Sequence, residues 1–293
     1  MKIALIKLHI AVFLAGFTGL LGVFIELNEG LLVTYRIAIT VIALLLILLF
    51  TKQLQLLPAK NILQLIGIGF LIALHWVCFF GSIKYANVSI GLVCFASTGL
   101  FTAIFEPIIV KRKFVLSELL LGLLSLLSIC LIFHFDIEYR TGIILGIISA
   151  ILAALFSTFN KKYIHIASPK TMMLYELTGG LLILLLCLPV YLKYFPAKYM
   201  FPTFSDIGWL LILALLCTVV AMDLMFQALQ KVSAFTQNLT LNLEPVYGIA
   251  LAFIVRHENK YLSASFYVGT GLIALSVFIQ MYITTKKYKR KSE

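Results

Sequence analysis

Six ionisable side chains of this sequence lie inside long apolar stretches, where a charge is costly. They are Arg36, His75, Glu106, Glu176, Asp223 and Glu244. A charged side chain at the centre of a bilayer costs about 2.5–3.5 kcal/mol on insertion scales, so each of them needs a partner or a function. The chemistry open to such a set is the binding of a charged solute or the movement of a proton.

Glu244 is the strongest candidate because it lies near the middle of its apolar stretch. Pro245 donates no amide hydrogen and therefore frees the carbonyl of Leu241 one turn earlier. A carboxylate beside a free carbonyl suits a cation, a proton or a substrate amine. The alternative is a protonated Glu244 that only holds neighbouring helices together. The polar positions on its helix face and beside it are Asn238, Thr240, Asn242 and Tyr247.

A second group of candidates lies on an earlier apolar stretch. His75 and Phe79 share a helix face with Ser82, and Trp76 is adjacent in the chain. An imidazole with aromatic walls could hold an amphipathic or aromatic substrate, and a histidine could also relay protons. A histidine that simply hydrogen-bonds to a neighbour is equally consistent with this pattern.

Arg36, Glu176 and Asp223 lie nearer the ends of their stretches, and each has two interpretations. Arg36 could hold a substrate carboxylate through two parallel hydrogen bonds, or it could extend its charged head to the outer membrane boundary. Glu176 and Asp223 lie in the inner thirds, where a carboxyl could belong to an inner gate or to a structural hydrogen bond. The sequence leaves these choices open.

The fourth apolar stretch carries two further polar features. Ser97 offers a hydroxyl, with Thr98 and Thr102 nearby, and this set is compatible with both a cavity wall and ordinary packing. Glu106 precedes the basic run 111–113 by about one turn, which favours a local ion pair.

These residues are carried by ten apolar stretches, each about as long as a helix that crosses a bilayer. The chain has 293 residues, of which 62% are hydrophobic and only 12% charged, about half the charged fraction of a soluble domain. The pattern predicts an all-α membrane protein with ten transmembrane helices. We place the spans at residues 6–25, 30–50, 62–83, 88–110, 115–134, 141–162, 171–192, 207–229, 234–255 and 263–285.

An even number of spans puts both ends of the chain on the same side of the membrane. With the N-terminus inside, the cytoplasmic segments hold 16 Lys and Arg residues and the outer loops hold 6, the remaining one being Arg36. Because basic residues accumulate on the cytoplasmic side, both termini are predicted to be cytoplasmic. We expect a multi-pass protein of the cell membrane (inner or plasma membrane).

The net charge of +11 does not indicate nucleic-acid binding, because the basic residues lie in loops and in a cluster at the end of the chain. The cluster consists of Lys286, Lys287, Lys289, Arg290 and Lys291, and it is typical of a segment that contacts anionic lipid. The five cysteines lie in apolar stretches without a CxxC pair, so the sequence predicts no metal site and no cofactor.

The two halves of the chain resemble each other weakly. Residues 82–87 before the fourth span parallel 228–233 before the ninth, and Gly122 parallels Gly269, at an offset of about 145–147 residues. The dipeptide Glu106-Pro107 recurs as Glu244-Pro245 at an offset of 138, two helical turns away from that register, and we treat it as a coincidence. Arg36 and Glu176 occupy related positions at an offset of 140.

Five spans per repeat is an odd number, so the second repeat must enter the membrane in the opposite sense. Many secondary transporters are built from such inverted repeats around a site at mid-membrane. We therefore expect two inverted five-helix repeats around a central cavity, with domains at residues 1–137 and 138–293.

Several motifs now resemble one family over essentially the whole chain. They are Ala73-Leu74-His75-Trp76, the join Ser82-Ile83-Lys84-Tyr85-Ala86-Asn87-Val88-Ser89, Glu106-Pro107 through Lys113, Tyr35-Arg36 and Tyr175-Glu176. Together they resemble a ten-span, EamA-type member of the drug/metabolite transporter superfamily. The resemblance implies a cavity lined by both halves and the export of small metabolites such as amino acids.

The sequence thus favours a secondary-active or facilitative transporter that exports or exchanges a small polar metabolite by alternating access. No Walker loop is present, so the energy must come from a gradient, and the buried carboxyls make proton coupling an option. An intramembrane enzyme acting on a lipid-soluble or small substrate is the alternative; there is no HExxH motif and no pair of aspartates at helical spacing. The oligomeric state stays open.

Overall fold

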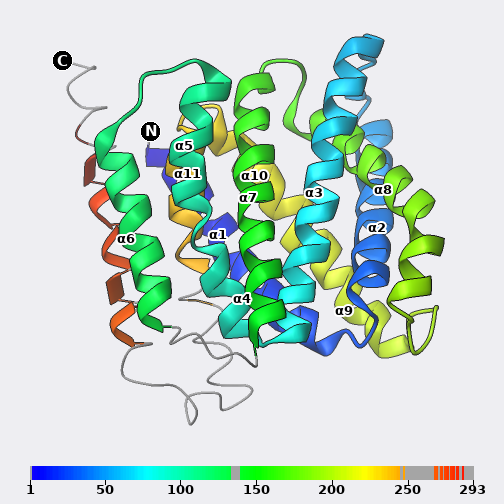
Figure 1. The fold of residues 1–293 in the computed structure, drawn as a ribbon. Coiled ribbons are helices and arrows are strands. Elements are labelled where there is room, and N and C mark those ends of the chain that lie inside the picture. The colour runs from blue at the N-terminus through cyan, green and yellow to red at the C-terminus, as the bar shows by residue number, and fades with distance from the viewer. Residues whose placement is uncertain are drawn as a thin grey trace.

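The computed structural model describes residues 2–132 and 139–244, Tyr247, and a set of positions between 267 and 286. Within these residues every regular element is a helix, and no strand occurs. The helices run roughly along one common direction, with α6 at one edge of the bundle and α2 and α8 at the opposite edge (Figure 1). The prediction of an all-α membrane protein is confirmed for the described part of the chain.

The first half of the chain forms six helices. Their bounds are α1 (Lys2–Phe24), α2 (Glu29–Phe50), α3 (Ala59–Tyr85), α4 (Val88–Phe95), α5 (Thr98–Val110) and α6 (Leu116–Ile132). Helices α4 and α5 together make one apolar span of 23 residues, interrupted at Ala96 and Ser97.

The second half likewise contains both uninterrupted and interrupted helices. Its elements are α7 (Arg140–Tyr163), α8 (Pro169–Tyr194), α9 (Phe204–Ala214), the π-helical segment η2 (Leu215–Val220), α10 (Ala221–Leu229) and α11 (Ala234–Leu241). Helices α9 and α10 and the segment η2 between them form one continuous span, Phe204–Leu229.

Seven of the ten predicted spans are helices long and apolar enough to cross a membrane. Their ends lie within a few residues of the predicted ones. Two shorter apolar helices, Leu116–Ser128 and Tyr267–Gln280, lie within the predicted fifth and tenth spans. Most of the predicted ninth span beyond α11, Pro245 included, lies outside the described residues.

The helix starts repeat between the two halves at the offsets that the sequence indicated. Asn28 caps α2 through Leu31 N–H and Ser168 caps α8 through Thr171 N–H, 140 residues later. Likewise, the side chain of Asn87 caps α4 and that of Ser233 caps α11, at an offset of 146. An oxygen-bearing side chain at these positions satisfies amides that would otherwise lack a partner in an apolar solvent.

Helices α4 and α11 are also interrupted at the same point. Both are eight residues long, and Ala96 follows the first as Asn242 follows the second, again at an offset of 146. In this register Glu244 corresponds to Thr98 and not to Glu106. The shared Glu-Pro dipeptide is therefore not an equivalent pair of sites.

The two halves meet where glycines let helix backbones touch. A Cβ atom on Gly69 of α3 would lie 1.7 Å from the backbone oxygen of Glu176 on α8, so only glycine fits there. The stripe Gly142, Gly146 and Ala150 of α7 packs in a similar way, and the Gly142 carbonyl accepts a hydrogen bond of 2.7 Å from Ser82 Oγ. In lipid, no hydrophobic force drives helices together, so their association depends on van der Waals packing. Small residues allow the close approach that this packing needs.

Contacts between the halves are reciprocal. Helix α2 of the first half packs against α9 and η2 of the second, and α8 of the second packs against α3 of the first. The second helix of each half therefore faces the third span of the other half. This arrangement places Arg36 of α2 and Glu176 of α8 at the two interfaces.

Candidate substrate cavity

One cavity, with an empty volume of about 750 Å³, lies between the two halves. Its walls come from α1 to α4 of the first half and from α7, η2, α10 and the α11 segment of the second. The polar lining residues are Thr18, Arg36, His75, Asn160, Cys217, Gln237 and Glu244. Five of the predicted site residues thus come together here: Arg36, His75, Trp76, Phe79 and Glu244.

The Arg36 guanidinium is held on two sides, and one of its nitrogens has no partner among the described residues. Its Nε donates a hydrogen bond of 2.8 Å to Thr218 Oγ1, and its Cζ lies 3.9 Å above the ring of Trp76. Nη1 is buried without a hydrogen-bond partner among the described residues. Of the two predicted roles, the buried position excludes the extension to the membrane boundary, because the residue is only 2% exposed.

The π-helical segment η2 supplies the partner of Arg36. Its wider turn lets Thr218 Oγ1 donate a hydrogen bond of 2.8 Å to the carbonyl of Leu213, five residues earlier, while the same oxygen accepts from Arg36. Segments of this kind interrupt the regular helix and are frequent at functional sites. The sequence offered no signal for η2.

His75 is an imidazole in an aromatic wall. Nδ1 lies 2.9 Å from the carbonyl oxygen of Ser149 and 2.8 Å from its hydroxyl oxygen, so Ser149 binds this nitrogen through both its backbone and its side chain. The rings of Phe95 and Phe156 lie with their centroids 5.4 Å away, and that of Phe79 lies at 6.2 Å. One nitrogen is thus satisfied by a neighbour, while the residue also forms part of the cavity wall.

Glu244 lines the cavity together with Gln237 and Leu241 of α11, which lie before the turn at residues 242–243. It interacts electrostatically with Arg36, but no direct ion pair joins the two side chains. The cavity therefore contains one guanidinium and one carboxyl that are separated from each other.

The other predicted site residues do not line this cavity. Tyr247 packs edge-on against Phe13, with ring centroids 5.5 Å apart. Asn242 Nδ2 donates to Ser125 Oγ on α6 at 3.3 Å, and Ser97 Oγ donates to the Cys94 carbonyl at 2.7 Å.

Asp223 and Glu176 also lie outside the lining. Asp223 forms an ion pair of 3.2 Å with Lys170 and accepts a hydrogen bond of 3.0 Å from Gln227. Glu176 is fully buried behind the cavity, and its Oε2 lies 3.5 Å from Nδ2 of the lining residue Asn160.

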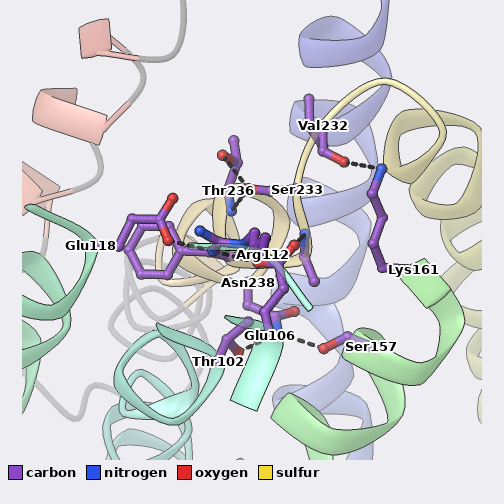
Figure 2. Close-up of polar contacts among 12 residues, drawn as sticks. Thr102, Glu106, Arg112, Glu118, Ser157, Lys161, Val232, Ser233, Thr236 and Asn238 are labelled. Carbon is purple, nitrogen blue, oxygen red and sulfur yellow. Dashed lines mark hydrogen bonds and ion pairs between the residues drawn. The ribbon is translucent and has the colours of Figure 1, made fainter. Parts of the chain in front are cut away.

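A cluster of charged side chains lies beside α11. Figure 2 shows Glu106 and Arg112 at its centre, with Glu118 on one side and Lys161 on the other. Glu106 pairs with Arg112 at 2.9 Å, as the basic run predicted, and Arg112 also pairs with Glu118. Burial disfavours the charged guanidinium, but these two carboxylates outweigh it and raise the pKa of Arg112.

Glu106 has a second role that the sequence did not indicate. Its two carboxylate oxygens accept hydrogen bonds of 3.0 and 2.8 Å from the backbone N–H groups of Ala234 and Phe235, in the first turn of α11. Lys161 donates to the carbonyl oxygens of Leu229 and Val232 just before that turn. Side chains of α5 and α7 thereby hold the start of α11.

Sequence reasoning missed several lining residues, and only some of them carried a signal. Gln237 could have been found, because it lies seven residues before Glu244, a spacing that would put both on one face of an uninterrupted helix. Asn160 is a lone amide near the end of an apolar helix. Thr18, Cys217 and the apolar lining of α10 resemble ordinary packing residues, and only the assembled bundle identifies them.

Comparisons with known proteins address the whole chain. Residues 2–134 and 140–282 each match the family model described as "EamA-like transporter family". No curated protein matches. A solved structure described only as "Crystal structure of protein" is similar over 97% of this chain and 98% of that chain, with a TM-score of 0.72 and 13% sequence identity. At that identity the similarity concerns the fold alone.

Proposed function

Because the chain belongs to the EamA-like transporter family, a family of multi-pass membrane transporters, we propose that it exports or exchanges a small zwitterionic metabolite such as an amino acid. One observation carries the proposal. A single cavity between the halves contains a buried guanidinium and a buried carboxyl that do not pair with each other.

The separation of the two charges fits a substrate that carries both. Arg36 offers Nη1, which has no partner among the described residues, to a carboxylate. Glu244 offers a carboxylate to an ammonium group, and a substrate between them would complete two ion pairs. A zwitterion replaces the water that each buried charge otherwise needs, and the net charge of the cavity does not change.

The walls indicate which side chain such a substrate would carry. Aromatic rings of four helices, α3, α4, α7 and α10, line the cavity, together with methionines and a leucine of α10. An apolar or aromatic group gains about 25 cal/mol for each Å² of apolar surface removed from water. We therefore propose amino acids with apolar side chains over acidic or basic ones.

We propose that the ten predicted spans form two inverted repeats, which rock against each other around this cavity. Three findings support the proposal: the recurring caps of α2/α8 and α4/α11, the matching interruptions after α4 and α11, and the reciprocal contacts of α2 and α8. The excess of basic residues in alternate loops supports cytoplasmic termini in the cell membrane.

Transport assays in proteoliposomes test this function. We expect uptake of labelled L-leucine and L-phenylalanine by the purified chain, and little uptake of L-glutamate or L-lysine. Arg36→Gln and Glu244→Gln should each reduce uptake at least about tenfold, because either change leaves one charge of the cavity unbalanced. The matched controls are Arg140→Gln and Glu26→Gln, since both residues are exposed.

Chromatography of the accumulated label separates transport from catalysis. A transporter returns L-leucine unchanged, whereas an intramembrane enzyme would return a modified compound. Uptake that is equal in the four variants and the unaltered chain would refute the assignment of Arg36 and Glu244.

A further inference from the structure

Glu176 is a buried carboxyl with no positive partner among the described residues. It is 0% exposed, in the first half of α8, and its Oε1 has no hydrogen-bond partner there. Within the same part of the chain, the only side chain that interacts with its carboxyl is that of Asn160. A carboxylate so placed would be far less stable than a neutral carboxylic acid, because neither water nor a cation compensates for its charge.

The ionisable groups on the described helices around α8 are occupied elsewhere or exposed. Arg36 binds Thr218, His75 binds Ser149, and Asp223 pairs with Lys170. The remaining groups on α2, α3 and α7 are Glu29, which accepts from Tyr191, Lys84 and Lys161, which donate to backbone carbonyls, and the exposed Lys60, Arg140 and Lys162. None of these groups neutralises Glu176.

The neighbouring amide shows where a proton would be accommodated. Asn160 Nδ2 lies 3.5 Å from Glu176 Oε2, while Asn160 Oδ1 and Glu176 Oε1 both lack a partner in the described structure. Buried acceptors without a donor are unfavourable. A proton on Oε1 supplies the missing donor, so that acid and amide can form two complementary hydrogen bonds.

Asn160 also lines the substrate cavity, so it connects the hidden carboxyl with the transported molecule. When Glu176 is protonated, both polar atoms of the Asn160 amide are engaged by the acid. When the proton leaves, Oδ1 loses its donor and becomes available to a substrate ammonium group. Proton and substrate thus compete for the same amide.

We propose that Glu176 is the proton carrier of this transporter, and that Asn160 couples its protonation to substrate binding, so that one proton is exchanged for one substrate. The proposal rests on the function proposed above. Arg36 and Glu244 lie in one cavity and interact electrostatically, whereas Glu176 stands at the position equivalent to Arg36 in the other half and has no such counterpart among the described residues. Coupling is thereby assigned to Glu176 and not to Glu244.

Infrared spectroscopy of the purified chain tests the proton without any substrate. The unaltered chain at neutral pH should show the C=O stretch of a protonated carboxyl that Glu176→Gln lacks, and Glu244→Gln and the matched control Glu26→Gln should retain that band. Glu176→Asp and Asn160→Ala should keep the band at a shifted frequency, because the acid loses its amide partner. These two variants preserve the test if Glu176→Gln does not fold. Identical bands in all chains would overturn the proposal.

Substrate binding tests the coupling. Trp76 lies in the cavity, and the only other tryptophan is Trp209, so a Trp209→Phe background gives a fluorescence signal from the site alone. We expect the apparent Kd for L-leucine to fall as pH rises, by up to about tenfold per pH unit for one linked proton. Glu176→Gln and Asn160→Ala should abolish this pH dependence, and Glu26→Gln should keep it.

The two proposals fail in different ways. If none of the amino acids is bound or transported, the proposed substrate class is wrong, but the infrared band still reports the protonation of Glu176. If L-leucine binding depends on pH equally in the unaltered chain and in Glu176→Gln, the proton carrier lies elsewhere and the transport function stands.

Discussion

At the scale of single residues, the best-defined feature of the cavity is the support of the Arg36 guanidinium. Thr218 fixes Nε, and the Trp76 ring lies flat against the charge at 3.9 Å. Both contacts use faces of the guanidinium that a carboxylate does not need. The residue is therefore oriented before a substrate arrives, which reduces the entropy lost on binding.

Replacement of Trp76 should weaken substrate binding without changing the charge of the cavity. A cation held over an aromatic ring gains about 1 kcal/mol, so Trp76→Leu should raise the KM for L-leucine uptake about fivefold. The KM of Trp76→Phe should lie between that of the unaltered chain and that of Trp76→Leu. Trp209→Leu is the control, because Trp209 packs against Phe24 and does not line the cavity. An unchanged KM in Trp76→Leu would show that the ring does not support Arg36.

The sequence predicted the residues of the cavity better than their partners. A charge or an aromatic group in an apolar stretch is visible by its type alone, which is why Arg36, His75, Trp76 and Glu244 were identified. The helix face that meets the cavity is not visible in this way. Tyr247 and Asn242 were expected beside Glu244, but the chain turns after Leu241, and Gln237 lies there instead.

At the scale of helices, the structure depends on close backbone contact between α3 and α8. Gly69 lies against the backbone of Glu176, whereas Gly67, two residues earlier on α3, has nothing within 4 Å of a Cβ position. These two glycines have the same chemistry in the same helix, and only one of them is needed for packing.

The substitutions Gly69→Ala and Gly67→Ala should therefore have opposite effects. Gly67→Ala should stabilise the helix by about 0.5–1 kcal/mol, because alanine loses less backbone entropy. Gly69→Ala must push α3 away from α8 and should lower the midpoint of thermal unfolding in detergent and reduce transport. Equal midpoints for the two variants would contradict the close approach of these helices.

The start of α11 gives a second prediction at this scale. Glu106→Gln keeps the size of the side chain, but it replaces a carboxylate that accepts from two amides and from Arg112. Bonds to charged groups contribute about 1.5–3 kcal/mol, so the variant should unfold at a lower temperature than the unaltered chain. Glu118→Gln, which leaves the amides of α11 capped, should have a smaller effect; the reverse order would disprove the capping role.

Helix ends were predictable to within a few residues, but helix interruptions were not. Span ends follow from apolar length and from capping residues such as Asn28 and Ser168. The turn at Ala96 and Ser97 contains neither proline nor glycine, and the π-helical turn of η2 packs against α1 and α2. Such deviations are set by tertiary contacts, and local sequence does not encode them visibly.

At the scale of the whole molecule, the proposed orientation is open to direct measurement. Lys52→Cys and Lys198→Cys place thiols in exposed loops after α2 and α8, which the distribution of basic residues assigns to opposite sides. A membrane-impermeant maleimide added to intact cells should label only Lys198→Cys, and both after lysis. If only Lys52→Cys is labelled in intact cells, the orientation is opposite to the proposed one. If both variants are labelled, the repeat arrangement is wrong.

The equivalent positions of Arg36 and Glu176 have a consequence for the architecture as a whole. An assembly of two first halves would bury two guanidinium groups at this level, and an assembly of two second halves would bury two unpaired acids. Two copies of the same half therefore could not replace the natural pair of halves. The halves have corresponding helices, but the equivalent positions 36 and 176 carry different charges. Any attempt to rebuild the protein as a homodimer of one segment would first have to neutralise that position.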